Sequence, residues 1–214
     1  MADTIRPEHL SAEDFILRVR EGAPDFHADT VGDHTFNPEI TDMFMAIERK
    51  PAAVLVPIVR REPGATMLFT QRTDNLTSHP GQVAFPGGRI DDDDISDEAA
   101  ALREAEEEIG LKPQDVEMIG RAPDYLTGSG YHIKPVLGLI GPDVDFRLNP
   151  EEVSDVFEVP LSFLMDPANH RVGNRIWKGV RRTYYEMPYG ERYIWGVTAG
   201  IVRILYERLY GDGA

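Results

Sequence analysis

The stretch of sequence that decides the fold is "GGRIDDDDISDEAAALREAEEEIGL", residues 87–111. Two glycines open it, and it holds ten acidic side chains but only two basic ones. Ser96 is a typical N-cap residue, and the two acidic side chains after it stabilise the first turn of a helix. Gly110 is the kind of residue that ends one. The pattern therefore predicts a strongly acidic helix over residues 96–110, entered through a glycine turn.

Carboxylates gather on one side of this helix, because positions three and four apart share a face. They are Glu104, Glu107 and Glu108. The opposite face is apolar and is expected to pack on a sheet; it carries Leu102, Ala105 and Ile109. Like charges at this spacing destabilise a bare helix by about 0.2–0.5 kcal/mol per pair. A hard divalent cation would relieve that repulsion, and Arg103 is placed to hold Glu107. A solvated acidic face is the alternative interpretation.

Segments before and after the helix predict strands, because they are β-branched or alternate in polarity. The predicted strands are 52–61 and 66–72 (paired as a hairpin), 79–88, 116–120, 131–141 (interrupted at Pro135), 153–161 (leading into a short helix) and a hairpin around Gly190. Helices are predicted over 11–22, between Ser11 and Gly22, and over 197–211, with an extended segment over 23–51. This mixture predicts an α/β (α+β) fold in one domain.

Composition excludes several classes of protein. The net charge of −15 is unfavourable for nucleic-acid backbones and for anionic membrane surfaces. The longest apolar run, residues 52–59, is too short to span a bilayer, and the first 15 residues show no signal-peptide pattern. The chain has no cysteine, so thiolate metal sites and disulfides are excluded. We expect a cytoplasmic protein with a small-molecule partner.

Residues 103–111, "REAEEEIGL", resemble the core of the Nudix box, R-E-U-x-E-E-x-G-U with U apolar. The loop before them is one residue longer than the standard box, with Asp94 in place of its first glutamate. Residues 68–88, "LFTQRTDNLTSHPGQVAFPGG", resemble the signature of the coenzyme A pyrophosphatase branch. The resemblance implies a Nudix-type α/β/α sandwich with a mixed sheet over residues 51–211. Residues 1–50 are expected to form an N-terminal extension with a short helix.

The resemblance also implies an activity and a set of site residues. Nudix enzymes hydrolyse a diphosphate with Mg²⁺ or Mn²⁺, and this branch acts on coenzyme A. The implied metal ligands are Glu104, Glu107, Glu108 and the carbonyl of Gly88, with Arg103 orienting the glutamates. The implied general base is Glu104, with Glu152 second and Asp124 third. The implied substrate-binding residues are Arg72, His79, Gln82 and Gly87.

Alternatives remain open for several of these residues. Arg72 on its own could be a surface arginine, His79 a structural histidine, and Glu152 an ordinary acid after a proline. Five aromatic residues are expected to be hairpin core for the most part, although one could stack on adenine: Tyr184, Tyr185, Tyr189, Tyr193 and Trp195. The substrate could instead be ADP-ribose, a dinucleoside polyphosphate or a nucleoside triphosphate, or the chain could be a non-catalytic nucleotide-binding module.

Three further expectations concern the surface. Asp91–Asp94 are predicted to lie in a solvated loop, and Glu106, on another face of the helix, is predicted to be dispensable. Many Nudix enzymes are dimers, so a homodimer is a further possibility, although nothing in the sequence shows an interface.

Overall fold

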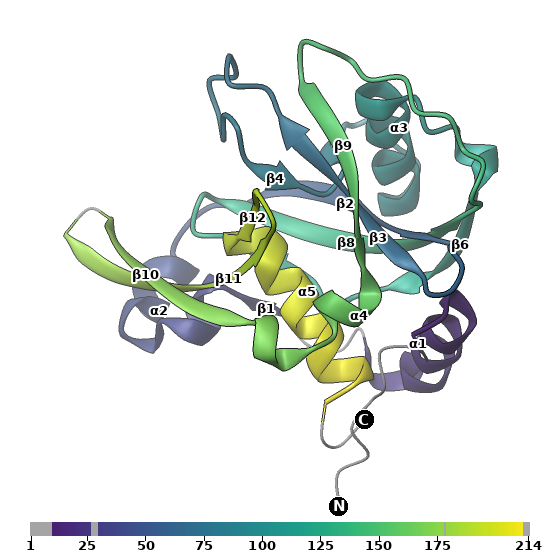
Figure 1. Ribbon diagram of the computed structural model, residues 1–214. Helices are drawn as coiled ribbons and strands as arrows, with labels where there is room; N and C mark the ends of the chain where they lie inside the picture. The colour runs from purple at the N-terminus through teal and green to yellow at the C-terminus, as the bar shows by residue number, and fades with distance from the viewer. Residues whose placement is uncertain (1–9, 27–29, 178, 212–214) are drawn as a thin grey trace, which may run out of the picture.

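A nine-stranded mixed sheet forms the middle of the protein in the computed structural model, which describes residues 10–26, 30–177 and 179–211 (Figure 1). Its strands are β1 (Val31–Gly32), β2 (Lys50–Val59), β3 (Thr66–Arg72), β4 (Val83–Ala84), β5 (Gly87–Arg89), β6 (Val116–Arg121), β7 (Tyr125–Leu126), β8 (Tyr131–Ile140) and β9 (Val153–Pro160). The main path runs β1-β7-β8-β2-β3-β4, with β5 on β2, β6 on β8 and β9 on β3. Most pairs are antiparallel, but β2 runs parallel to β8 along its whole length.

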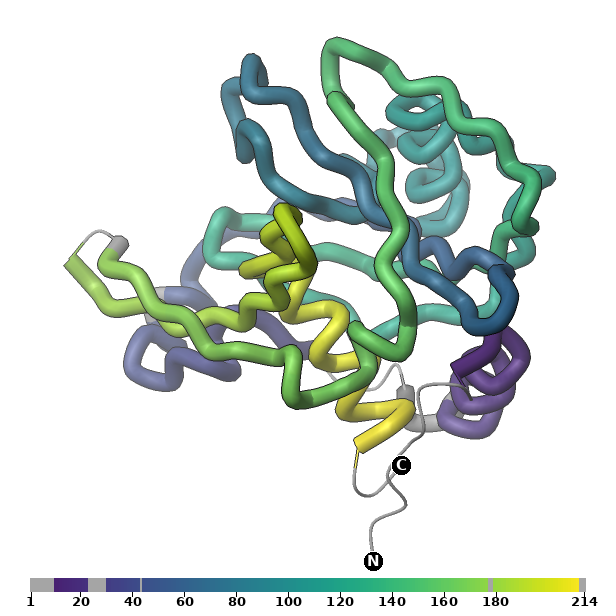
Figure 2. Tube along the Cα trace, viewed as in Figure 1, coloured from purple at the N-terminus to yellow at the C-terminus, as the bar shows by residue number. Residues whose placement is uncertain are grey.

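Helices cover both faces of this sheet. One face carries α3 (Asp97–Ile109); the other carries α1 (Ala12–Phe26), α4 (Leu161–Leu164) and α5 (Gly196–Leu209). Figure 2 shows α1 and α5 side by side although they come from the two ends of the chain. Arg18 of α1 donates from Nη1 to the carbonyl of Leu209 at 2.8 Å. The predicted α/β/α sandwich is confirmed.

The strand pattern explains why two layers of helix can pack on one sheet. Successive side chains of a strand point to opposite faces. Leu55 and Val59 of β2 therefore lie in the cluster under α3, whereas Val56 and Ile58 lie in the cluster under α1 and α5. All four are buried, and this explains why the sequence of β2 is continuously apolar and does not alternate between apolar and polar residues.

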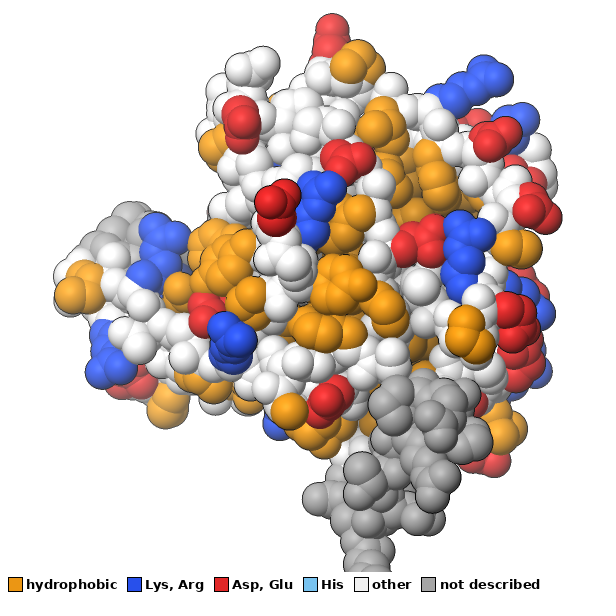
Figure 3. Space-filling model, viewed as in Figure 1, with side chains coloured by type: hydrophobic (Ala, Val, Ile, Leu, Met, Phe, Trp, Pro, Cys, Tyr) orange, Lys and Arg blue, Asp and Glu red, His pale blue; other side chains and the backbone are white. Residues whose placement is uncertain are grey.

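A three-stranded antiparallel sheet projects from this body, on the left in Figure 1; within the described residues it consists of β10 (Arg171–Trp177), β11 (Val180–Tyr189) and β12 (Arg192–Trp195). The predicted hairpin around Gly190 is confirmed by the β11–β12 pairing. The sequence analysis does not predict β10, whose residues alternate apolar with polar or glycine only in part. Figure 3 shows basic side chains along the projecting strands.

The N-terminal region differs from the predicted extended segment. Ser11 caps α1 as predicted, since its Oγ accepts the N–H of Asp14 at 3.1 Å. The helix continues past Gly22, because a glycine costs a helix only about 1 kcal/mol and Phe15 and Val19 anchor α1 in the core. Short helical turns then follow: η2 (Asp33–Phe36), η3 (Pro38–Ile40) and α2 (Thr41–Met45). Their turns are held by local hydrogen bonds, which periodicity does not reveal.

Two predictions about the strands need correction. Pro135 does not interrupt β8: its carbonyl accepts the N–H of Ala122 at 3.0 Å, so its missing N–H points to the same edge, at the break between β6 and β7. The β2–β3 hairpin pairs only at its closed end, at Ile58–Met67 and Val59–Thr66, because β5 and β8 flank most of β2 and β9 takes most of β3. The remaining short helices are η4 (Pro113–Asp115) and η5 (Pro167–Asn169).

Two expectations about the chain as a whole have limited tests. In the part of the chain that the structure describes, no helix is long and apolar enough to cross a membrane. The expectation of no leader rests largely on residues 1–9, which lie outside the described residues. The division at residue 50 stays a prediction, and α1 packs into the same core as β2 and β3.

Candidate active site

The predicted acidic helix forms as α3, with both of its predicted ends. Ser96 Oγ accepts the N–H of Ala99 at 3.1 Å, and Gly110 ends the helix with a left-handed φ of 69°. Ala105 and Ile109 are fully buried against the sheet, as predicted. Glu108 does not fit the alternative of a solvated acidic face, because it is only 2% exposed. Its position lies next to the buried stripe, so the last turn of α3 carries a carboxylate under the glycine turn.

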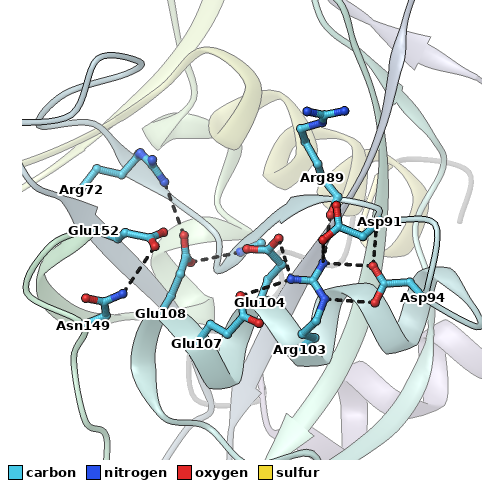
Figure 4. A network of polar contacts seen from close by, with 11 residues as sticks. Arg72, Arg89, Asp91, Asp94, Arg103, Glu104, Glu107, Glu108, Asn149 and Glu152 are labelled. Carbon is cyan, nitrogen blue, oxygen red and sulfur yellow. Dashed lines mark hydrogen bonds and ion pairs between the residues drawn. The ribbon is translucent and has the colours of Figure 1, made fainter.

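Arg103 organises the acidic side chains around itself (Figure 4). Its Nη1 contacts Glu104 Oε1 at 3.1 Å and Glu107 Oε2 at 3.2 Å, so the predicted bracing of Glu107 is present. Its Nε and Nη2 each donate to one oxygen of Asp94 at 3.0 Å. Nη2 also donates to the carbonyl of Arg89 at 3.1 Å. Glu107 is 56% exposed, so it is the most accessible of the three box glutamates.

Asp94 corrects the prediction that the whole Asp91–Asp94 run is solvated. Its side chain is only 7% exposed and forms a two-pronged ion pair with Arg103. It also accepts the N–H of Asp91, and the hydrogen bond from Arg103 lowers its pKa. The other three aspartates of the run are exposed, as predicted. The signal that could have singled out Asp94 is its spacing, since it stands where the standard box has a glutamate.

Glu108 joins α3 to the glycine turn and to β3. Its Oε2 accepts the N–H of Gly87 at 3.1 Å, and its Oε1 lies 3.4 Å from Nη1 of Arg72. Burial raises its pKa to about 7, against the opposing pull of these two donors, and the charges of Glu104 and Glu152 raise it further. The contacts present are therefore not enough to offset the cost of a buried negative charge.

Glu104 lies against the other glycine of the turn. A Cβ placed on Gly88 would come within 2.5 Å of its carboxyl group, so only glycine allows this approach. Burial raises the pKa of Glu104; Arg103 opposes the shift, and Glu107 and Glu152 add to it. Glu152 comes from the loop before β9, where its carbonyl accepts the N–H of Thr73 at 2.9 Å. The structure thus brings the second predicted base to the box carboxylates.

The donor set fits a hard divalent cation in its chemistry. The groups are carboxylate oxygens that repel one another, and glycine backbone borders them, which is the environment that Mg²⁺ or Mn²⁺ favours. In the described residues, however, no three acidic or histidine side chains are already gathered around one point in a way that could hold a metal ion. Arg103 draws Glu104 and Glu107 toward itself, while Gly87 and Arg72 hold Glu108. The predicted ligand set therefore stays a prediction.

Asp124, the third predicted base, lies at the other end of α3. It contacts Nε2 of His132 at 2.6 Å and Nζ of Lys134 at 3.5 Å, and Lys134 also contacts Asp97 at the start of the helix. Glu108 lies eleven residues beyond Asp97 in α3, a separation of about 16 Å at 1.5 Å per residue. The structure therefore does not bring Asp124 to the box carboxylates.

A cleft of about 480 Å³ opens beside the glycine turn. The predicted substrate-binding residues all line it: Arg72, His79, Gln82 and Gly87, with Gly88 beside them. Nδ1 of His79 lies 3.0 Å from Oε1 of Gln82, and His79 adopts a left-handed φ of 55°. Arg72 is half-buried at the end of β3, where its Nε finds no hydrogen-bond partner among the described residues. The signature segment therefore lines the cleft, and its glycine turn separates the cleft from Glu104 and Glu108, which contact that turn.

Apart from two aromatic candidates, the rest of the cleft wall was not predicted from the sequence. It includes Asp33, Asn37, Arg89, Arg175 and Arg182. Two of the five aromatic residues also line it, Tyr184 and Trp195. Two others pack elsewhere, since Tyr185 meets Phe36 edge-on at 4.8 Å and Tyr189 meets Phe163 at 4.9 Å. These segments lie far apart in sequence, so only the folded chain shows them as one surface.

Comparison with known proteins identifies the family. The model of the NUDIX domain matches residues 49–177. The chain belongs to the Nudix family. A protein of Escherichia coli (strain SMS-3-5 / SECEC) described as "Uncharacterized Nudix hydrolase NudL" is 40% identical over 197 residues, or 92% of this chain and 93% of that protein. A protein of Shigella boydii serotype 4 (strain Sb227) with the same description gives the same values.

A solved structure, "Crystal structure of a Nudix Hydrolase from M. Smegmatis, RenU", is 23% identical and covers 53% of this chain and 71% of that one, with a TM-score of 0.45. Family membership makes this chain a Nudix hydrolase that acts on a diphosphate bond of a nucleoside diphosphate derivative. Hydrolases of this family generally use divalent metal cations.

Proposed function

We propose that this Nudix hydrolase cleaves the diphosphate bond of coenzyme A or its derivatives, giving 3′,5′-ADP and 4′-phosphopantetheine or its acyl form. The observation that carries the proposal is the shared cleft. The segment that resembles the coenzyme A pyrophosphatase signature supplies Arg72, His79 and Gln82 to it. The glycine turn that contacts the box carboxylates lines the same cleft. The contact between the glycine turn and the box carboxylates supports a single substrate site that extends from the cleft to α3.

The proposed metal ligands are Glu104, Glu107, Glu108 and the carbonyl of Gly88, with Mg²⁺ or Mn²⁺ as the cation. When bound, such a cation supplies charge neutralisation for the diphosphate and orientation for the attacking water. Arg103 orients Glu104 and Glu107 through its contacts with both, and its ion pair with Asp94, in the loop before α3, holds the guanidinium in place. Arg72, at the cleft edge, is placed to bind a phosphate oxygen through its guanidinium.

The proton of the attacking water needs an acceptor close to the site. Glu104 and Glu152 are the two candidates, in that order, because each carboxylate is near enough to shift the pKa of its neighbours. Burial and repulsion keep the pKa of Glu104 raised, which makes it a stronger base when ionised. Water adds its oxygen to phosphorus, its proton passes to the carboxylate, and the bridging P–O bond breaks.

A comparison of kcat/KM over a substrate panel tests this proposal. The panel contains coenzyme A, an acyl-coenzyme A, ADP-ribose, a dinucleoside polyphosphate and a nucleoside triphosphate, each with Mg²⁺ and with Mn²⁺. The proposal expects coenzyme A or its acyl form to have the highest kcat/KM. A higher value for ADP-ribose or a triphosphate overturns the substrate and leaves the diphosphate chemistry standing. No turnover of any member would indicate a nucleotide-binding module.

A further inference from the structure

The end of the cleft away from α3 joins segments from both sides of the matched family region to β10, which lies within it. Asp33 and Asn37 precede residue 49, where that region begins. Trp195 follows residue 177, where it ends. The three-stranded sheet and the start of α5 complete this wall. Figure 1 shows these elements on the side of the molecule away from α3.

Hydrogen bonds fix this wall before any ligand binds. Asn37 is 1% exposed; its Nδ2 donates to the carbonyl of Thr183 at 3.0 Å, and its Oδ1 accepts the N–H of Thr183 at 2.7 Å. Asp33 accepts the hydroxyl of Tyr125 at 2.9 Å and the N–H of Gly128 at 2.7 Å. The N-terminal segment and β11 are thus joined through buried, satisfied polar groups. Such a surface is preorganised for recognition.

Trp195 is the aromatic contact that this wall offers to the cleft. Tyr184 meets its ring edge-on at 5.3 Å, and Tyr193 stacks with it at 6.1 Å. The guanidinium of Arg175 lies over the same ring, 5.7 Å from the centroid. Aromatic rings of this kind bind nucleobases by stacking, without strong preference for one base. The combination of an indole ring and an adjacent guanidinium suits the base and an anionic group of one nucleotide.

Arg175 lines the cleft without a carboxylate partner in the part of the chain that the structure describes. In this strongly acidic protein, arginines such as Arg61 and Arg121 are paired with carboxylates. Within the described residues, Arg175 and Arg89 form no ion pair, and both line the cleft. Arg182, beside Arg175, is close enough to Asp33 for their charges to attract. Arg175 is therefore the exposed, uncompensated cation at the Trp195 end.

Arg72 and Arg89 occupy the other end, next to the carboxylates. Arg72 contacts Glu108, and the carbonyl of Arg89 accepts a hydrogen bond from Arg103 (Figure 4). The cleft therefore presents positive charge at two separate places. A substrate whose only anionic group is a diphosphate needs just one of these two positively charged places.

We propose that Arg175, beside Trp195, binds a second phosphate of the substrate: a phosphomonoester on the nucleoside end, separate from the diphosphate that is cleaved. The inference rests on the proposed function, because coenzyme A carries such a group on its ribose. Arg175 is then a specificity-determining residue, which selects nucleotides with this extra phosphate over those without it. The N-terminal segment and β11 hold the surface on which this selection takes place.

The first test compares coenzyme A with dephospho-coenzyme A, which lacks only the phosphomonoester. A charge-assisted contact supports a preference of about tenfold or more in kcat/KM for coenzyme A. Arg175→Gln is expected to reduce that ratio to near one, mainly through KM, because the contact is remote from the reacting atoms. Arg181→Gln is the matched control, an exposed arginine of β11 that does not line the cleft. It should keep the wild-type ratio.

The second test measures binding without catalysis. Trp177→Phe leaves Trp195 as the one tryptophan of the chain, and its fluorescence is titrated with 3′,5′-ADP and with 5′-AMP in EDTA. The inference expects 3′,5′-ADP to bind about tenfold more tightly, and Arg175→Gln to remove the difference. Circular dichroism confirms that the variants are folded.

The outcomes separate this inference from the proposed function. If both forms of coenzyme A are hydrolysed equally, the inference is overturned and the proposed function stands. If neither is hydrolysed, the proposed function fails, and the titration decides the inference alone. Equal affinity for 3′,5′-ADP and 5′-AMP, or a preference that survives Arg175→Gln, overturns it.

Discussion

The two ends of the cleft differ in the polar groups that they hold away from water. At the α3 end, Glu104 and Glu108 are buried close to other carboxylates, and burial raises the pKa of both. At the far end, Asn37 is buried and exchanges two hydrogen bonds with the backbone of Thr183. Asp33, whose pKa burial also raises, accepts hydrogen bonds from Gly128 and Tyr125. The two ends are therefore proposed to bind different parts of the substrate. At the α3 end, carboxylates lie where a cation and a diphosphate are proposed to bind, whereas at the far end hydrogen bonds hold the wall that carries Arg175 and Trp195.

The largest effect is expected from removing charge at the α3 end. Glu108→Gln keeps the size of the side chain but removes a proposed metal ligand. The bound metal ion would stabilise transition-state charge by several kcal/mol. We expect kcat to fall about a thousandfold. Glu106→Gln is the matched control, because Glu106 is exposed on another face of α3, and it should keep wild-type kcat. Steady-state kinetics with saturating Mg²⁺ measures both. Equal damage from the two changes would refute the assignment of faces.

The second effect is on the stability of the metal-free protein. Folded Glu108, with a pKa of about 7, holds a proton at pH values where the unfolded chain, with the ordinary value of 4.5, has lost it. The free energy of unfolding should therefore decrease as pH rises from about 5 to about 8, by something of the order of 3 kcal/mol. Urea denaturation in EDTA at several pH values measures this.

Glu108→Gln is also the control for that pH dependence. The variant should be more stable than wild type at pH 8 in EDTA, with a flatter profile, since no proton has to be lost at this position. A profile as steep as that of wild type would mean that the buried carboxylate is not the source of the instability.

The third effect concerns the far end of the cleft. Asn37→Ala leaves the N–H and carbonyl of Thr183 without their partner in a buried place, which costs about 2 kcal/mol in the free energy of unfolding. Chemical denaturation measures the loss. Asn174→Ala, an exposed asparagine on β10, provides the comparison and should change stability little. If the two substitutions cost the same, the N-terminal segment is not held by this network.

The smallest effect is expected from weakening the bracing of Arg103. Asp94→Asn removes one charge from the two-pronged ion pair, so Arg103 holds Glu104 and Glu107 less firmly. We expect kcat to fall about tenfold, which corresponds to about 1.4 kcal/mol. Asp92→Asn, in the exposed part of the same run, should have no effect. A normal kcat for Asp94→Asn would make Asp94 an ordinary loop residue.

The two ends of the cleft also differ in how many of their features could be predicted from the sequence. The ends of α3 and the position of Glu107 next to Arg103 follow from local spacing, so they could be predicted. The burial of Glu108 and Asp94 depends on where the glycine turn and the loop fold back onto the helix, and spacing alone does not show this.

Most of the far wall of the cleft could not be predicted from the sequence. Asn37 and Thr183 are 146 positions apart, and Arg175 lies on β10, a strand that the sequence analysis did not predict. Periodicity reports neighbours along one element, whereas this surface joins elements from both sides of the matched family region. The resemblance to the coenzyme A pyrophosphatase signature predicts the residues along one side of the cleft only.

Identification of the products formed from coenzyme A tests the central claim most directly. The purified protein is incubated with coenzyme A and Mg²⁺ or Mn²⁺, and the products are identified by mass spectrometry. The account predicts equal amounts of 3′,5′-ADP and 4′-phosphopantetheine, formed only with a divalent cation and not by folded Glu108→Gln. Absence of 3′,5′-ADP with either cation, or its formation by Glu108→Gln at the wild-type rate, would contradict the account.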